Sequence, residues 1–310
     1  MGHADAPAVN RAETLRGAVG AASAMTFVGS LAAVSGLLTQ YPVLGGQAVR
    51  YATGALILFA VMRVRRLPAI RLTARELGLL VLLAATGLAA FNVCILLALR
   101  TVSPAMVGTI IGCTPIVLAV TGPLLAHRRP AARVLAASVV VALGAGVAQG
   151  LGDGSLAGFL LALGALAGEA AFSLLAVPLL PRLGPLRVSA YAAALAVPLL
   201  FAAGIVVDGR GVLRLPSPAE FGALAYQAVV VTAVAFVLWY GSIPRLGADR
   251  AGLFAGLVPI SAAACSLLLG TGRPTVADLL GAVLVGTGVA AGMAPGRRAR
   301  EARSEPAAQP

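Results

Sequence analysis

Uninterrupted apolar runs of about 20 residues recur along the chain, and each could cross the roughly 30 Å hydrocarbon core of a bilayer as a helix. The sequence is 59% hydrophobic and only 11% charged, whereas a soluble domain is about 45–50% apolar and about 25% charged. A single large soluble core would need many long helices buried on every side. We therefore expect an all-α integral membrane protein.

The apolar runs and their polar boundaries predict ten transmembrane helices. Because the connections are short, helices that follow one another in the sequence should be antiparallel neighbours. The predicted helices span residues 18–38, 47–62, 77–99, 104–126, 132–149, 156–179, 188–207, 221–240, 251–269 and 276–293.

The basic residues set the predicted orientation. The net charge is +12 and all 23 basic residues are arginine, but they lie between the apolar runs and not on one face, so nucleic-acid binding is not expected. With the N-terminus inside, 18 arginines fall on the inner side and four fall outside, namely Arg100, Arg210, Arg214 and Arg273. Arginine is retained on the cytoplasmic side, so both termini should be cytoplasmic. The first helix should act as an uncleaved signal-anchor.

An internal repeat divides the chain. "GTIIGCTPIVLAV" at Gly108 aligns with "GLFAGLVPISAAA" at Gly252, an offset of 144 residues. Thirteen of 37 positions are identical between 108 and 144, where chance would give roughly four or five. We expect a five-helix repeat at 17–150 and another at 154–293, between a cytoplasmic tail at 1–16 and a basic cytoplasmic tail at 294–310. An odd helix number inverts the second repeat, as in secondary transporters.

The repeated motif is G-x-x-x-G-x-x-P. Its glycines would let a neighbouring backbone approach closely, and its proline would kink the helix and free a carbonyl near mid-membrane. Close packing alone, or a hinge lining a cavity, would each explain the pattern. The residues concerned are Gly108, Gly112, Pro115, Gly252, Gly256 and Pro259.

Glu169 is the one acid within an otherwise apolar run, "LLALGALAGEAAFSLLAVPLL". A carboxylate near the membrane centre costs about 2.5–3.5 kcal/mol on insertion scales, so it should face protein or a water-filled cavity. It is a candidate proton carrier or partner for a cationic substrate group. A hydrogen-bond anchor between helices, or a salt bridge to Arg50, is the structural alternative. Its helix face is otherwise small: Gly158, Ala162, Ala165, Ser173 and Ala176.

Other intramembrane polar residues are weaker candidates. Arg50, near the outer end of the second helix, could snorkel to the interface or contact a substrate carboxylate. Ser23, Thr26 and Ser30 share one face of the first helix, where they could line a pathway or bond to their own backbone carbonyls. Further candidates without a spacing argument are Asn92, Gln47 and Gln227, while Tyr226, Trp239 and Tyr240 are expected to be interfacial anchors.

The sequence lacks the motifs of common nucleotide-binding, metal-binding and redox sites. The sequence has no P-loop and no H-E-x-x-H, and its three cysteines form no C-x-x-C pair, so each is expected to be a small buried hydrophobe. Glu169 has no second intramembrane carboxylate with which to form an acid/base pair. We expect no cofactor, no metal and no enzymatic activity.

The architecture resembles the drug/metabolite transporter superfamily, and specifically its EamA-type transporters. The resemblance covers about Gly17 to Gly292 and includes "VRYATGALIL" in the second helix, the prolines Pro115 and Pro259, and "RRP" and "GRP" in the loops that follow them. It implies secondary transport of small metabolites, often export of amino acids or drugs. Related four-helix multidrug transporters carry a coupling Glu in their first helix, which implies such a role for Glu169.

These observations favour a multi-pass inner-membrane transporter that exports small organic metabolites or drugs by alternating access. Proton coupling through Glu169 is a further expectation. Its partners would be the substrate and the lipid bilayer, as a monomer or homodimer. A membrane-embedded enzyme and a facilitative channel are the alternatives.

Overall fold

The fold is known from a computed structural model that describes residues 11–149, 155–268, 270 and 275–294. Within those residues every regular element is helical, so the all-α expectation is confirmed. Arg273, the tail at 295–310 with its four arginines, and residues 1–10 of the other tail lie outside the described residues.

Nine helical segments of the described chain are long and apolar enough to cross a membrane, and this is a multi-pass membrane protein. A tenth apolar helix, Ala132–Val147, is shorter. The nine segments are Arg11–Leu38, Val43–Val64, Ala74–Ala98, Pro104–Leu125, Leu156–Leu174, Leu180–Val212, Pro218–Leu246, Ala248–Leu268 and Val276–Met293.

The first five predicted helices correspond to nine elements, because three of the predicted helices are interrupted. The third changes to a π-helix at η2, the fourth breaks at Gly112 and Cys113, and a 3₁₀ turn, η1, follows the first. The elements are α1 Arg11–Ser35, η1 Gly36–Leu38, α2 Val43–Val64, α3 Ala74–Leu82, η2 Leu83–Ala90, α4 Phe91–Ala98, α5 Pro104–Ile111, α6 Thr114–Leu125 and α7 Ala132–Gln149.

The second five correspond to ten elements with similar interruptions. A second π-helix, η4, divides the eighth predicted helix, and a 3₁₀ turn, η5, divides the ninth. The elements are α8 Leu156–Leu174, α9 Leu180–Asp208, η3 Gly209–Val212, α10 Pro218–Tyr226, η4 Gln227–Val234, α11 Ala235–Leu246, α12 Ala248–Gly252, η5 Leu253–Gly256, α13 Leu257–Leu268 and α14 Val276–Met293.

Several helix starts are fixed by short polar side chains that cap free backbone N–H groups. Ser103 and Ser155 accept hydrogen bonds from the amides of Met106 and Gly158. Reciprocal capping boxes begin three helices. Their residue pairs are Thr73 with Glu76, Ser217 with Glu220, and Thr275 with Asp278.

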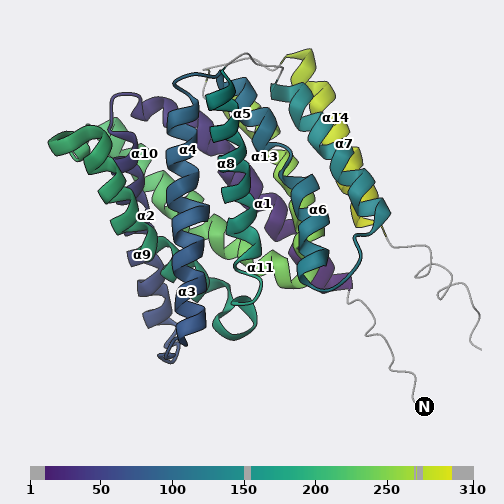
Figure 1. The fold of residues 1–310 in the computed structure, drawn as a ribbon, viewed down its shortest axis with the longest axis horizontal. Helices are drawn as coiled ribbons and strands as arrows, with labels where there is room; N and C mark the ends of the chain where they lie inside the picture. Colours follow the sequence, from purple (N-terminus) through teal and green to yellow (C-terminus); the bar gives the residue numbers. More distant parts are fainter. Residues whose placement is uncertain (1–10, 150–154, 269, 271–274, 295–310) are drawn as a thin grey trace, which may run out of the picture.

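The helices pack into a bundle in which matching elements of the two halves meet. α7 lies beside α14 at one edge, and α2 lies beside α9 toward the other (Figure 1). Glycines allow the first contact, because a Cβ on Gly144 would lie 2.8 Å from Leu284 Cβ and one on Gly288 would lie 2.7 Å from Val141 Cγ2. Close backbone approach through small residues is how membrane helices associate without a hydrophobic driving force.

Side-chain contacts also join the connecting segments. Arg182 pairs with Glu76 and donates to the Arg71 carbonyl oxygen, so the start of α9 is bound to the start of α3. Arg245 Nε donates to Glu13 Oε2 at 2.8 Å, which links α11 to α1. At the other end, Arg214 pairs with Glu220, and the Tyr41 hydroxyl donates to the Arg214 carbonyl oxygen at 3.0 Å.

Candidate functional site

Two π-helices shape the centre of the candidate site. η2 and η4 each occupy eight residues within a longer span. A π-helix carries an extra residue per turn and often marks a functional site. η2 packs against α8 and α9, and η4 packs against α1 and α2, so segments from both halves of the chain converge here.

Arg50 is buried between α2 and η4, with 5% of its surface exposed. Its Nε donates to Thr232 Oγ1 at 2.7 Å, and its Nη1 donates to Gln47 Oε1 at 3.0 Å. The guanidinium carbon also lies 5.0 Å from the centre of the Tyr51 ring, within cation–π range. The side chain therefore turns into the protein and does not snorkel, which corrects one of the two expectations for Arg50.

Helix length explains this correction. The prediction placed the start of the second helix at residue 47, one turn before Arg50. α2 begins at Val43, which puts Arg50 about two turns inside the helix, at about 1.5 Å of rise per residue. An arginine at that depth needs polar partners within the bundle, and Thr232 and Gln47 provide them.

Tyr51 also belongs to a cluster of aromatic rings next to Arg50. The Tyr51 and Phe236 ring centres are 6.1 Å apart, and Phe236 is 4.8 Å from Phe172. Phe172 is in turn 4.9 Å from Tyr240. Asn92 Nδ2 lies 3.5 Å from the Tyr51 hydroxyl and donates to the Leu88 carbonyl oxygen at 2.7 Å. The cluster Tyr51, Phe236, Phe172 and Tyr240 (the aromatic cluster below) joins α2, α8 and α11.

Trp239 and Tyr240 are core residues, so the expectation that they are interfacial anchors is wrong. Trp239 is 2% exposed and its Nε1 donates to Ser173 Oγ at 3.1 Å. The Tyr240 hydroxyl is fully buried and donates to the Phe172 carbonyl oxygen at 3.1 Å. The prediction ended the eighth helix at residue 240, whereas α11 continues to Leu246 and carries both rings away from the helix end.

Glu169 lies on the predicted small face of α8. The five small residues of that face are buried, and Glu169 is half-buried among them. Among the described residues it has no ion-pair or hydrogen-bond partner, and the alternative of a salt bridge to Arg50 is wrong. α8 ends at Leu174 and not at 179, so Glu169 lies nearer the helix end than predicted.

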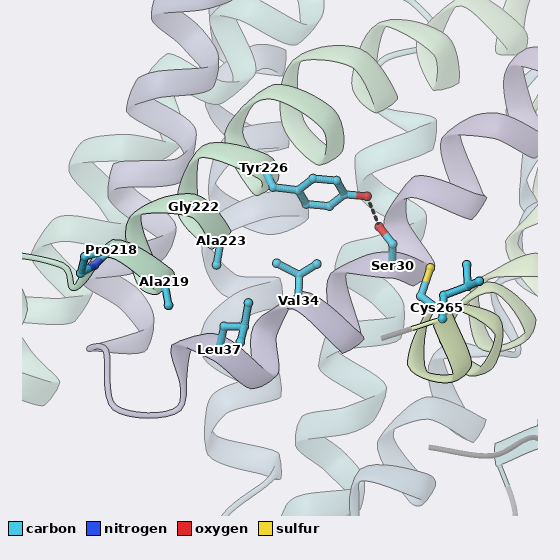
Figure 2. Close-up of a pocket in the computed structure, with 10 residues that line it drawn as sticks. Ser30, Val34, Leu37, Pro218, Ala219, Gly222, Ala223, Tyr226 and Cys265 are labelled. Atoms are coloured by element: carbon cyan, nitrogen blue, oxygen red, sulfur yellow. Dashed lines mark hydrogen bonds between the residues drawn. The ribbon is translucent and has the colours of Figure 1, made fainter. Parts of the chain in front are cut away.

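An apolar groove of about 430 Å³ opens between α1, α10 and α13 (Figure 2). Val34, Leu37 and Ala223 point into it, and Cys265 lies on the wall opposite α10. Ser30 and Tyr226 close one end through a 2.7 Å hydrogen bond between their hydroxyls. Ser30 also donates to the Phe27 carbonyl oxygen at 2.7 Å, so it both bonds to its own helix and lines a groove.

The other first-helix candidates do not join this groove. Ser23 is half-buried and Thr26 is exposed, so the predicted polar face is not uniformly directed inward. Gln227 is fully buried at the start of η4, where its Nε2 donates to Ser35 Oγ at 3.4 Å. Its Oε1 has no partner among the described residues.

The repeated glycine and proline positions lie at helix breaks. α6 begins just before Pro115, after the break at Gly112, and α13 begins two residues before Pro259, after η5. A Cβ on Gly252 would lie 2.9 Å from Leu118 Cβ, and one on Gly256 would lie 2.4 Å from Val141 Cγ1. These two glycines therefore support close packing, while Gly108 is half-buried.

The cysteines and acidic residues suggest no metal centre. Cys94, Cys113 and Cys265 are free and half-buried, less enclosed than expected. Within the described part of the chain, no three His, Cys, Asp or Glu side chains gather closely enough to hold a metal ion.

The chain is similar to a protein family, to a bacterial relative and to a protein of known structure. Residues 156–291 match the EamA-like transporter family. The chain is 24% identical over 252 residues to the uncharacterized transporter YetK of Bacillus subtilis (strain 168), which covers 79% of this chain and 76% of YetK. The chain is thus similar to EamA-like transporters over its second half, and to a transporter over most of its length. A protein of known crystal structure, 17% identical, shares the fold with a TM-score of 0.75 over 91% of this chain and 97% of its own.

The family match covers only part of the candidate site. The matched residues include Glu169, Phe172 and Thr232, whereas Arg50 and Tyr51 precede them. Sequence reasoning did not identify Thr232 or the aromatic cluster as part of the site. Thr232 lies 182 residues from Arg50 in the chain, and no local pattern links the two.

Proposed function

We propose that this EamA-type chain is a secondary active transporter that exports small organic metabolites or drugs across the cytoplasmic membrane by alternating access. The observation that carries the proposal is the convergence of α2, α8, η4 and α11 on one polar and aromatic cluster. Segments from both halves meet there, so a relative movement of the halves would change access to the cluster from each side.

The proposed architecture has ten transmembrane helices in two inverted five-helix repeats. The element bounds support it, because α3, η2 and α7 recur as α10, η4 and α14 with every boundary displaced by 144 residues. The tenth span would be α7, whose apolar part Ala132–Val147 lies at the position equivalent to the start of α14. An odd number of spans in each half would place the second repeat upside down relative to the first.

The proposed orientation has both termini in the cytoplasm. The ion pairs of Arg182 with Glu76 and Arg245 with Glu13 each join segments that the arginine distribution assigns to the inner side. The contact between Tyr41 and Arg214 joins two segments assigned to the outer side. Each pairing is consistent with the proposed topology, and a miscounted helix would bring opposite sides together.

Glu169 is the proposed coupling residue. It is half-buried, it has no ionic partner among the described residues, and it belongs to α8, a helix that packs against η2. A carboxyl group in that position can take up a proton from one side and release it to the other as access alternates. A substrate cation could compete for the same group.

The test is flux in liposomes that contain the purified protein and an enclosed pH-sensitive dye. Organic acids, amines and amino acids are added to separate samples under an imposed pH gradient, with protein-free liposomes as the blank. We expect saturable, slow proton-linked flux with one of these classes, and at least a tenfold loss in Glu169→Gln. Glu220→Gln is the matched control, because Gln preserves a capping box.

Two results would contradict separate parts of the proposal. If Glu169→Gln left flux and its pH dependence intact, Glu169 would not be the coupling residue. If no class gave saturable flux, or if flux rose linearly at channel-like rates, secondary transport would be wrong.

A further inference from the structure

Arg50 carries a buried positive charge that no described carboxylate offsets. The ion pairs of the described chain involve Arg16, Arg182, Arg214 and Arg245, all at the ends of helices or next to them. The two side chains that accept hydrogen bonds from Arg50, those of Thr232 and Gln47, are both neutral.

One nitrogen of the guanidinium remains available. Nε and Nη1 are used, while Nη2 donates to no described residue. The fully buried side-chain nitrogen and oxygen atoms that lack a partner are Arg187 Nε and Gln227 Oε1, so Arg50 Nη2 is not among them. An atom with neither a partner nor complete burial faces accessible space. Nη2 is thus positioned to donate to a molecule that is absent from the structure.

A structural role alone does not explain a cation at this depth. Placing a charge within a bilayer is expensive, and a neutral amide could hold Thr232 and Gln47 at lower cost. A guanidinium is favoured where a planar anion must be bound, because its N–H groups match the two oxygens of a carboxylate.

We propose that the guanidinium of Arg50 binds the anionic group of the transported molecule, and that this molecule is a small organic carboxylate with an apolar body. The inference rests on the proposed transport function and names its substrate class. Tyr51 lies beneath the guanidinium and begins the aromatic cluster, which gives an apolar or aromatic body a surface to stack against. Asn92 holds the Tyr51 ring in place, since its Nδ2 donates to the Tyr51 hydroxyl at 3.5 Å.

The charge balance favours a carboxylate over a phosphate. One guanidinium neutralises one negative charge, so a bound monocarboxylate offsets the charge of Arg50. A phosphate monoester carries close to two negative charges at neutral pH and would leave one uncompensated. The described residues offer no second cation in contact with Thr232, Gln47 or Tyr51.

Ligand-induced stabilisation of the purified full chain in detergent tests the inference. Trp239 is the only tryptophan, and it lies next to the aromatic cluster, so its fluorescence reports thermal unfolding. The probes are 3-phenylpropionate, its neutral amide, the matching amine 3-phenylpropylamine, and phenyl phosphate, with hexanoate as a non-aromatic acid. A ligand that binds only the folded state raises the apparent Tm with concentration.

We expect 3-phenylpropionate to raise Tm and the amide and amine to bind at least about tenfold more weakly, since neither carries the negative charge that strengthens a hydrogen bond from Arg50. Arg50→Gln should abolish the carboxylate shift, and Arg50→Lys should weaken it. Arg210→Gln removes an exposed arginine and should change nothing. If Arg50→Gln does not fold, Arg50→Lys and the comparison of probes on the unaltered chain decide.

Several results would overturn the inference. They are equal shifts from the amide and the acid, a larger shift from phenyl phosphate, no shift from either carboxylate, or an unchanged shift in Arg50→Gln. The experiments can reject the proposed transport function and the proposed substrate class independently of each other. Saturable flux of an amine that is insensitive to Arg50→Gln would keep the transporter and reject the carboxylate, whereas carboxylate binding without flux in liposomes would do the reverse.

Discussion

Residues 74–149 and residues 218–293 have the same sequence of interruptions at an offset of 144, yet they place different chemistry on that framework. The same offset aligns Arg50 with Ala194 and Glu169 with Met25. Helix breaks and glycine contacts are therefore shared, while each charged group at the centre occurs in one half alone. Packing requirements act on both copies of a repeat, whereas a single bound molecule needs each polar group only once.

The largest effect should come from the shared framework at the α7–α14 contact. Gly144→Ala and Gly288→Ala each place a Cβ within 2.8 Å of the partner helix, so each should destabilise the protein by about 1–3 kcal/mol. The two losses should be similar because the positions are equivalent. Thermal unfolding followed by Trp239 fluorescence measures both.

Gly78→Ala and Gly222→Ala provide the matched controls for that pair. They are also equivalent positions, and nothing lies within 4 Å of the added Cβ in either case. Their Tm values should stay level or rise, since alanine favours a helix by up to about 1 kcal/mol over glycine. A marked loss in only one member of the Gly144 and Gly288 pair would show that the halves do not share their packing.

A smaller effect is expected where the halves differ. Thr232→Val removes the acceptor for Arg50 Nε in a fully buried setting, and an unsatisfied buried donor costs about 1–3 kcal/mol before any relaxation. Thr232→Ser keeps the hydroxyl and should behave nearly as the unaltered chain does. The framework equivalent of Thr232 is Leu88, so no matching loss of a hydrogen bond is possible in the first half. Equal Tm values for the Val and Ser variants would mean that Thr232 does not hold Arg50.

The smallest effect on stability should come from replacing Glu76 or Glu220, two carboxylates at equivalent positions that have different partners. Glu76 and Glu220 both close capping boxes, but Glu76 binds Arg182 of α9 and Glu220 binds Arg214 of the preceding turn. Gln keeps either capping box and removes the charge. Glu76→Gln should speed hydrogen exchange in both α3 and the start of α9, and Glu220→Gln should affect only the α10 region. High salt should reduce the difference, because exposed pairs are screened.

Hydrophobic run length was enough to predict the all-α class and the approximate place of every apolar helix. It could not predict the π-helices, because η2 and η4 have the same apolar composition as the α-helices on either side. Hydrophobic run length also misplaced the ends of helices that contain polar residues near their termini. "GGQAVR" looks like a boundary, yet α2 already begins at Val43.

The sequence pointed clearly to the charged residues of the candidate site but not to the side chains around them. Arg50 and Glu169 stand out in the sequence because a charge in an apolar run is costly. Their surroundings depend on which helices meet, and that is set by contacts between residues more than sixty positions apart. The hydrogen bond of Trp239 to Ser173 and that of Arg50 to Thr232 are examples, and a hydropathy pattern contains neither.

The α7–α14 contact also constrains the order in which the chain can assemble. α7 leaves the ribosome 144 residues before the equivalent part of α14, an interval of roughly 7–29 s at 5–20 residues per second. Throughout that time the glycine face of α7 has no α14 to meet, and lipid or another helix must cover it. α14 therefore completes the packing of a helix from the first half of the molecule, and a chain cut short before Val276 would leave both halves unfinished.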